Sequence, residues 1–185
     1  IVQDTSFLIV GERTNANGSR AFRNAMLSGD IDRCVAIGEE QVTESAHVVD
    51  LCVDYVGRDG TDDMAAIAQR FASEITVPVV LDSTEPDVMQ AGLEHLGGRS
   101  VLNSLNLEDG SGPGSRAQQV LELAKEHGAA VVGPARAAPS ALKVLPVDGI
   151  QRPEGAEPHT IIGLILQGVD KGLPSSRVLE PAEGH

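Results

Sequence analysis

The chain has 185 residues, a formal net charge of −13 and a sequence pI near 4.6, and its length suits one domain with a sizeable core. The acidic balance argues against nucleic acid as the main partner, because phosphate contacts need a basic face, and no apolar run approaches the roughly 20 residues of a membrane span. Cys34 and Cys52 form no close-spaced pair, which predicts reduced, buried thiols in a cytoplasmic protein and no metal site.

A strand-then-helix unit recurs along residues 1–133. The apolar run at residues 7–10 predicts a first strand that is buried on both faces. Asp30 is expected to cap a helix, and a Val-rich strand follows over residues 47–53. Thr61 is expected to cap the next helix, whose apolar residues recur at i, i+3, i+4 and i+7.

The same alternation continues through the next two units. Further strands are expected over three short runs, at residues 77–81, 100–102 and 129–132. Pro86 in the first turn and Gly97 beyond the end predict a helix after the third strand. Ser115 and Gly128 are expected to cap the last helix at its two ends. Strands that alternate with helices predict a parallel sheet with helical crossovers.

The chain changes character after Gly133. Residues 1–133 contain 21 acidic and 9 basic residues, whereas residues 134–185 are nearly balanced in charge and contain seven of the ten prolines. Prolines interrupt helices and limit strand pairing, and the only apolar run here is at residues 159–167. The sequence therefore predicts two parts: an ordered α/β part over 1–133 and an irregular, Pro-rich tail over 134–185.

Polar side chains follow the predicted strands where each strand ends. The candidates are Glu12, Asp50, Asp54, Asp82 and Asn103. The carboxyl ends of parallel strands lie on one side, where barrels and open α/β sheets bind ligands. An acidic rim without lysine is poor for phosphate but suits a ligand that offers several N–H donors, because a carboxylate accepts two parallel bonds.

Each of these residues also has a structural alternative. Asp54 precedes a long loop, so it is equally expected to stabilise a turn. Ser83 and Thr84 are better placed than Asp82 to cap the helix that follows, and a carboxylate at the end of an apolar strand is costly to bury without a partner. Asn103 both donates and accepts hydrogen bonds, which suits the edge of a heterocycle.

Four motifs at these positions resemble the pterin-binding domains of cobalamin-dependent methionine synthases. They are GERTNANG at 11–18, VDLCVD at 49–54, LDST at 81–84 and VLNS at 101–104. The runs VDYVGRDG at 53–60 and AGLEHLGG at 91–98 are most similar to the actinobacterial form. The resemblance covers about residues 5–132, and the first motif favours a methyltransferase over dihydropteroate synthase.

The resemblance implies a (βα)₈ TIM barrel that binds 5-methyltetrahydrofolate at its C-terminal rim. The family passes the N5 methyl group to cob(I)alamin, which another domain of the same or another chain holds. By motif match Asp82 and Asn103 correspond to pterin-ring ligands that act in catalysis. The other implied substrate-binding residues are Glu12, Asn15, Asp50 and Asp54. Asn103 cannot supply a proton, so it is expected to orient the ring while water carries the proton to N5.

Only the first four to five βα units of such a barrel are recognisable. The run GPARAAP at 133–139 stands where the family continues into further units. The chain is expected to be a truncated or frame-shifted fragment; a rearranged relative and discontinuous pieces of a longer chain are the alternatives.

Other functions compete with folate binding for methionine synthesis. Another corrinoid methyltransferase is one alternative. A dihydropteroate synthase-like enzyme is a second, and it needs basic residues for a diphosphate, for which Arg13 and Arg58 are the candidates. A non-catalytic partial barrel is the third. Its open sheet edges would favour oligomers.

Overall fold

The computed structural model describes residues 8–105, 112–133 and 143–145. The strands are β1 (Val10–Gly11), β2 (Val48–Leu51), β3 (Val79–Asp82), β4 (Val101–Asn103), β5 (Ala130–Gly133) and β6 (Lys143–Leu145). The helices are α1 (Arg20–Ser28), α2 (Ile31–Thr43), α3 (Thr61–Glu74), α4 (Pro86–Leu93) and α5 (Arg116–His127). Within these described ranges no helix has both the length and the apolar character needed to cross a membrane.

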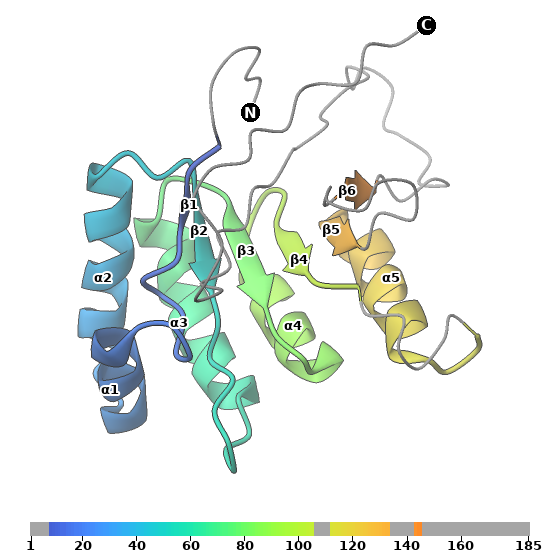
Figure 1. Cartoon of the computed structure of the whole chain (residues 1–185), viewed down its shortest axis with the longest axis horizontal. Coiled ribbons are helices and arrows are strands. Elements are labelled where there is room, and N and C mark those ends of the chain that lie inside the picture. Colours follow the sequence, from blue (N-terminus) through green and yellow to red (C-terminus); the bar gives the residue numbers. More distant parts are fainter. Residues whose placement is uncertain (1–7, 106–111, 134–142, 146–185) are drawn as a thin grey trace, which may run out of the picture.

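The strands form one sheet in the order in which they occur along the chain, from β1 to β6 (Figure 1). The first five are parallel, and each pairs with the next. A doubly wound sheet reverses its strand order, whereas the wall of a TIM barrel does not. The five parallel strands with their alternating helices confirm the prediction of a partial α/β barrel.

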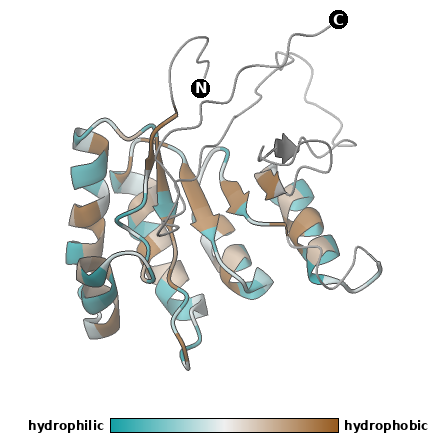
Figure 2. Cartoon of the chain, viewed as in Figure 1, coloured by the Kyte–Doolittle hydropathy of each residue, from teal (hydrophilic) through white to brown (hydrophobic). Residues whose placement is uncertain are grey.

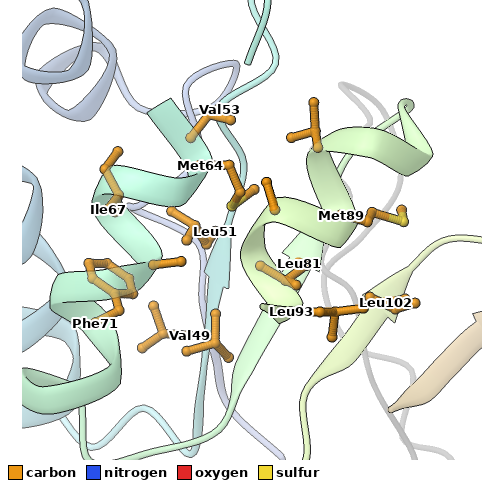
Figure 3. Packing of buried hydrophobic residues seen from close by; sticks show 14 of the residues in the cluster. Val49, Leu51, Val53, Met64, Ile67, Phe71, Leu81, Met89, Leu93 and Leu102 are labelled. Carbon is orange, nitrogen blue, oxygen red and sulfur yellow. The ribbon is translucent and has the colours of Figure 1, made fainter. Parts of the chain in front are cut away.

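One face of the sheet packs against the helices. Figure 2 shows mostly apolar strands beside helices that carry both apolar and polar residues, as amphipathic helices do. The contact between β2, β3, β4 and the helices is visible in Figure 3. It is made by Val49, Leu51, Val53, Met64, Ile67, Phe71, Leu81, Met89, Leu93 and Leu102. All buried hydrophobic side chains of the described helices belong to this cluster, so these helices cover one face of the sheet.

The opposite face of the sheet has an apolar layer and a polar layer. Four buried valines, Val48, Val80, Val101 and Val132, form a second cluster that contains no residue of the described helices. Side chains alternate along a strand, so residues two positions apart point the same way. Asp50, Asp82 and Asn103 follow three of these valines by two residues. They therefore lie on the helix-free face, at the carboxyl ends of β2, β3 and β4.

Two helices begin as the sequence predicts. The Asp30 side chain accepts a hydrogen bond from the backbone N–H of Arg33 over 3.0 Å at the start of α2. Ser115 caps α5 in the same way, and Gly128 ends that helix in the left-handed region with φ of 65°. Both caps satisfy backbone groups that the helix itself leaves without partners.

Two features of the helices differ from the prediction. The N-cap of α3 is Gly60, not Thr61, which is the first helical residue and whose backbone N–H donates to Asp59. Helix α1 was not predicted, although the sequence carries its signals: Ser19 caps its start and Gly29 ends it with φ of 74°. Helix α1 has nine residues and lies directly before α2, so the apolar residues of the two helices form one longer pattern in the sequence.

The last strand differs from a regular barrel repeat, because β6 pairs with β5 in the antiparallel direction. A parallel return needs a crossover of about a dozen residues or more, and residues 134–142 are too few for one. Phe7 of the predicted first strand and the apolar run at 159–167 lie outside the described residues.

Candidate functional site

The site is built at the carboxyl ends of β1 to β4. Asp82 of β3 and Asn103 of β4 are register partners, and the Asn103 amide donates to Asp82 Oδ1 over 3.1 Å. Backbone pairing of two central strands therefore fixes this contact. Asp82 is partly exposed, so its carboxylate is accessible from the rim.

Asn15, in the loop between β1 and α1, connects the two aspartates. Its Nδ2 donates to Asp50 Oδ2 over 2.9 Å and to Asp82 Oδ2 over 3.2 Å. Its Oδ1 accepts from the backbone N–H groups of Asn17 and Gly18, at 2.9 and 3.1 Å. These two acceptor contacts fix the orientation of the amide, so both of its hydrogens face carboxylates.

The carboxyl groups of the site hold protons more tightly than usual. Asp50 is only 3% exposed, and burial, followed by the charge of Asp82, raises its pKa to about 7. Burial and the charge of Asp54 raise the pKa of Asp82, while Arg116 favours its ionised form. Burial and Asp82 also raise the pKa of Glu12. These shifts are expected when several carboxyl groups share a partly desolvated region.

A buried polar chain supports Asp50 from behind. Gln41 of α2 donates to the Thr14 hydroxyl over 3.1 Å, and Thr14 donates to the backbone carbonyl of Asp50. The Gln41 side-chain oxygen accepts the backbone N–H of Arg13. Sequence reasoning missed this role of Gln41. Its signal is a buried polar residue on the face of α2 that otherwise contacts the core.

Asp54 has a structural role. Its carboxylate accepts from the Ser83 hydroxyl and the Thr84 backbone N–H, each at 2.7 Å, and from the Thr84 hydroxyl at 3.0 Å. It therefore ties the loop after β2 to the loop after β3. A cavity of about 570 Å³ adjoins Asp54 and is lined mainly by residues 54–61 and the start of α4; Asp50, Asp82 and Asn103 do not line it.

Arg116 is a further residue that the sequence did not reveal. It stands at the start of α5, and its guanidinium donates to the backbone carbonyl of Ser83 over 2.8 Å. Its positive charge favours the ionised form of Asp82. A single arginine after a Gly-rich loop carries no signal of its own, so only the fold brings it to the rim.

The arrangement is suited to an organic ligand with N–H donors. The described residues include no group of three or more His, Cys, Asp or Glu side chains placed to hold a metal ion. The rim instead offers carboxylate acceptors and amide groups from four neighbouring strands or their loops. Such groups recognise the edge of a nitrogen heterocycle by parallel hydrogen bonds.

Comparison with known proteins agrees with this chemistry. The sequence pattern of the family described as pterin binding enzyme matches residues 11–144. The chain belongs to this family. The chain is 58% identical over 130 residues to methionine synthase of Mycobacterium tuberculosis (strain ATCC 25618 / H37Rv) and, over the same length, to that of Mycobacterium leprae (strain TN).

The likeness covers different shares of the two kinds of chain. It spans 70% of this chain but 11% of each mycobacterial protein. The matched part therefore corresponds to about a tenth of the length of those relatives. The resemblance to the pterin-binding part of methionine synthases is confirmed.

Proposed function

We propose that the chain binds 5-methyltetrahydrofolate at the carboxyl ends of its strands, as the pterin-binding part of a cobalamin-dependent methionine synthase. The observation that carries the proposal is the pair formed by Asp82 and Asn103 in a member of the pterin binding enzyme family. The identity with two methionine synthases supports the choice of a methylated folate as the substrate.

Asp82 is the proposed acceptor for the 2-amino-pyrimidinone edge of the pterin. An ionised carboxylate offers about four lone-pair positions, and amide hydrogens of Asn15 and Asn103 use two of them. The remaining positions can accept parallel N–H bonds from the ligand, which are stronger when the acceptor is charged. Glu12, whose pKa responds to Asp82, is the proposed neighbour on the side of β1.

Asn103 is the proposed orienting group for the reaction. In the described residues its side chain makes one hydrogen bond, through Nδ2 to Asp82, which leaves its Oδ1 for the ligand. Methyl transfer from N5 needs a proton or hydrogen bond at that nitrogen as the leaving group develops. An amide supplies no proton, so we assign proton delivery to water and the methyl acceptor role to cob(I)alamin on another domain.

Ion pairing disfavours the diphosphate-dependent alternative. Arg13 is paired with Glu40 and Glu44 at 3.4 and 2.9 Å, and Arg58 is paired with Asp63. A dihydropteroate synthase-like reaction would need these guanidinium groups for its leaving group. Their pairing with carboxylates makes both guanidinium groups poor partners for a diphosphate, and Arg116 is engaged by the Ser83 carbonyl. These contacts support binding of methyltetrahydrofolate instead.

Isothermal titration of the full chain with 5-methyltetrahydrofolate tests the proposal. We expect saturable binding to the wild type and to the control Asp62→Ala, an exposed position on α3. Asp82→Ala and Asn103→Ala are expected to abolish binding. Unchanged affinity in both of these variants would overturn the assignment of the site.

A further inference from the structure

We propose that Asp50 is a positioning residue: it carries the one proton that the Asp50–Asn15–Asp82 cluster retains, and thereby leaves Asp82 as the only charged acceptor in the cluster. The inference rests on the proposed function for the identity of the ligand. It assigns Asp50 a neutral role behind the pterin site, where motif resemblance alone would make it a second charged ligand residue.

The geometry of Asn15 requires the two aspartates to be close. Oxygens of Asp50 and Asp82 lie 2.9 and 3.2 Å from the same nitrogen atom. The amide cannot reverse, because Asn17 and Gly18 hold its oxygen. The linker is neutral and no cation lies between the two groups in the contacts of the described residues. The Asn15 hydrogen bonds favour the charged form of each carboxyl group, whereas burial and the like charge of the neighbouring carboxylate oppose ionisation of both together.

The surroundings place that proton on Asp50. Asp50 is 3% exposed, and its Oδ1 is buried without a hydrogen-bond partner in the described part of the chain. A buried carboxylate charge without full hydrogen bonding costs more than an unpaired neutral O–H group, so protonation lowers the cost at this position. Asp82 is more exposed, accepts two amide N–H groups, and is stabilised as an anion by Arg116. The pKa of Asp50, which burial raises to about 7, agrees with a proton on Asp50 and a negative charge on Asp82.

The titratable groups that act on this pair come from several neighbouring elements. They are Glu12 after β1, Cys52 after β2, Asp54 in the following loop and Arg116 on α5. Three of these four are carboxyl groups or a thiol, and the one cation acts on Asp82. The neighbouring charges therefore disfavour a negative charge on Asp50 and permit one on Asp82.

A neutral Asp50 has a consequence for ligand binding. A bound heterocycle excludes water from the rim and makes a second buried charge still less favourable. Ligand binding therefore favours the state in which Asp50 holds its proton. By linkage, affinity for the ligand falls as pH rises through about 7, because binding must then recover that proton from solution.

Infrared spectroscopy of the ligand-free chain tests the proton assignment directly. Asp50→Asn is isosteric and keeps an acceptor for Asn15, and Asp62→Asn is the matched control on an exposed helix position. At about pH 6 we expect a protonated-carboxyl C=O band in the wild type and the control, with part of its intensity missing in Asp50→Asn. Identical bands in Asp50→Asn and the wild type would overturn the proposal.

Folate titration provides the second arm. Asp50→Asn is expected to bind 5-methyltetrahydrofolate within about threefold of the wild type at about pH 6 and to lose the decline toward about pH 8.5, whereas Asp82→Asn loses at least about tenfold. A loss in Asp50→Asn as large as in Asp82→Asn would mean that Asp50 works ionised and would overturn the proposal. Failure of the wild type to bind folate would contradict the proposed function alone, because the infrared result decides the proton assignment independently.

Discussion

Asp82 and Asn103 lie directly opposite each other on β3 and β4, and the Asn103 amide donates to the Asp82 carboxylate over 3.1 Å. The contact depends on strand register, because a shift of one residue would turn Asn103 to the helix-covered face. Groups placed on strands keep their geometry better than groups placed on loops. The centre of the site is therefore part of the sheet itself.

Asn103→Asp is expected to destabilise the fold by replacing a donor with a second carboxylate opposite Asp82. Loss of the hydrogen bond and repulsion of like charges should cost roughly 1–3 kcal/mol at neutral pH. The deficit should shrink on acidification, since protonation of either carboxyl restores a donor. Urea unfolding at several pH values measures it, with Asn24→Asp on the exposed face of α1 as the control. An equal cost at all pH values would contradict the electrostatic origin.

The stability of the fold should decrease as pH rises through the range in which Asp50 titrates. Its folded-state pKa of about 7 lies above the ordinary aspartate value of 3.8, so between these two pH values the folded chain holds a proton that the unfolded chain releases. The stabilisation is complete below about pH 3.8 and is lost by about pH 7, and amounts to up to roughly 4 kcal/mol. Asp50→Asn should flatten this part of the curve. If the melting temperatures of the wild type and of Asp50→Asn change with pH in the same way, Asp50 is excluded as the cause.

Gly11→Ala should be costly because β1 approaches α2 closely. A Cβ at Gly11 would lie 2.8 Å from Gln41 Oε1 and 3.1 Å from Gln41 Cβ. The substitution must displace Gln41 from Arg13 and Thr14, at an expected cost of about 1–3 kcal/mol.

Gly97→Ala is the matched control for the Gly11 substitution. A Cβ at Gly97 meets nothing within 4 Å, so its effect should stay within about 0.5 kcal/mol. Chemical unfolding compares the two variants. If both cost the same, the buried polar chain through Gln41 does not support the site.

Asp54→Ala should loosen the loop after β3. The Thr84 backbone N–H donates to Asp54 over 2.7 Å, and a hydrogen bond to a charged acceptor contributes about 1.5–3 kcal/mol. Hydrogen exchange of the Thr84 amide should therefore accelerate at least about tenfold, while Asp62→Ala leaves it unchanged. Unaltered exchange at Thr84 in Asp54→Ala would show that the loop keeps its shape without this carboxylate.

The sequence predicts most of the sheet because its signals are local. Apolar runs mark β2 to β5, and Asp30, Ser115 and Gly128 mark helix ends with side chains or conformations that few other residues supply. The positions of Asp82 and Asn103 follow from the rule that parallel strands end on one side. These features need no knowledge of contacts between distant segments.

The remaining features depend on contacts that no local pattern contains. Asn15 connects residues 35 and 67 positions away, and Arg116 reaches the rim only because α5 packs beside α4. Helix α1 and the antiparallel direction of β6 were also not predicted. The pairing of Asp54 with the next loop could be stated only as an alternative, because Asp before a long loop serves both roles.

The central claim is that the Asp82 carboxylate binds the amino-imine edge of a pterin. The most direct measurement compares the affinities for 5-methyltetrahydrofolate and for its analogue without the 2-amino group in the wild type and in Asp82→Asn. We predict that the wild type prefers the amino-bearing ligand by at least about tenfold. Asp82→Asn should lose most of this preference, because the variant cannot form a charge-assisted hydrogen bond with the 2-amino group. The same preference in both proteins would contradict the claim.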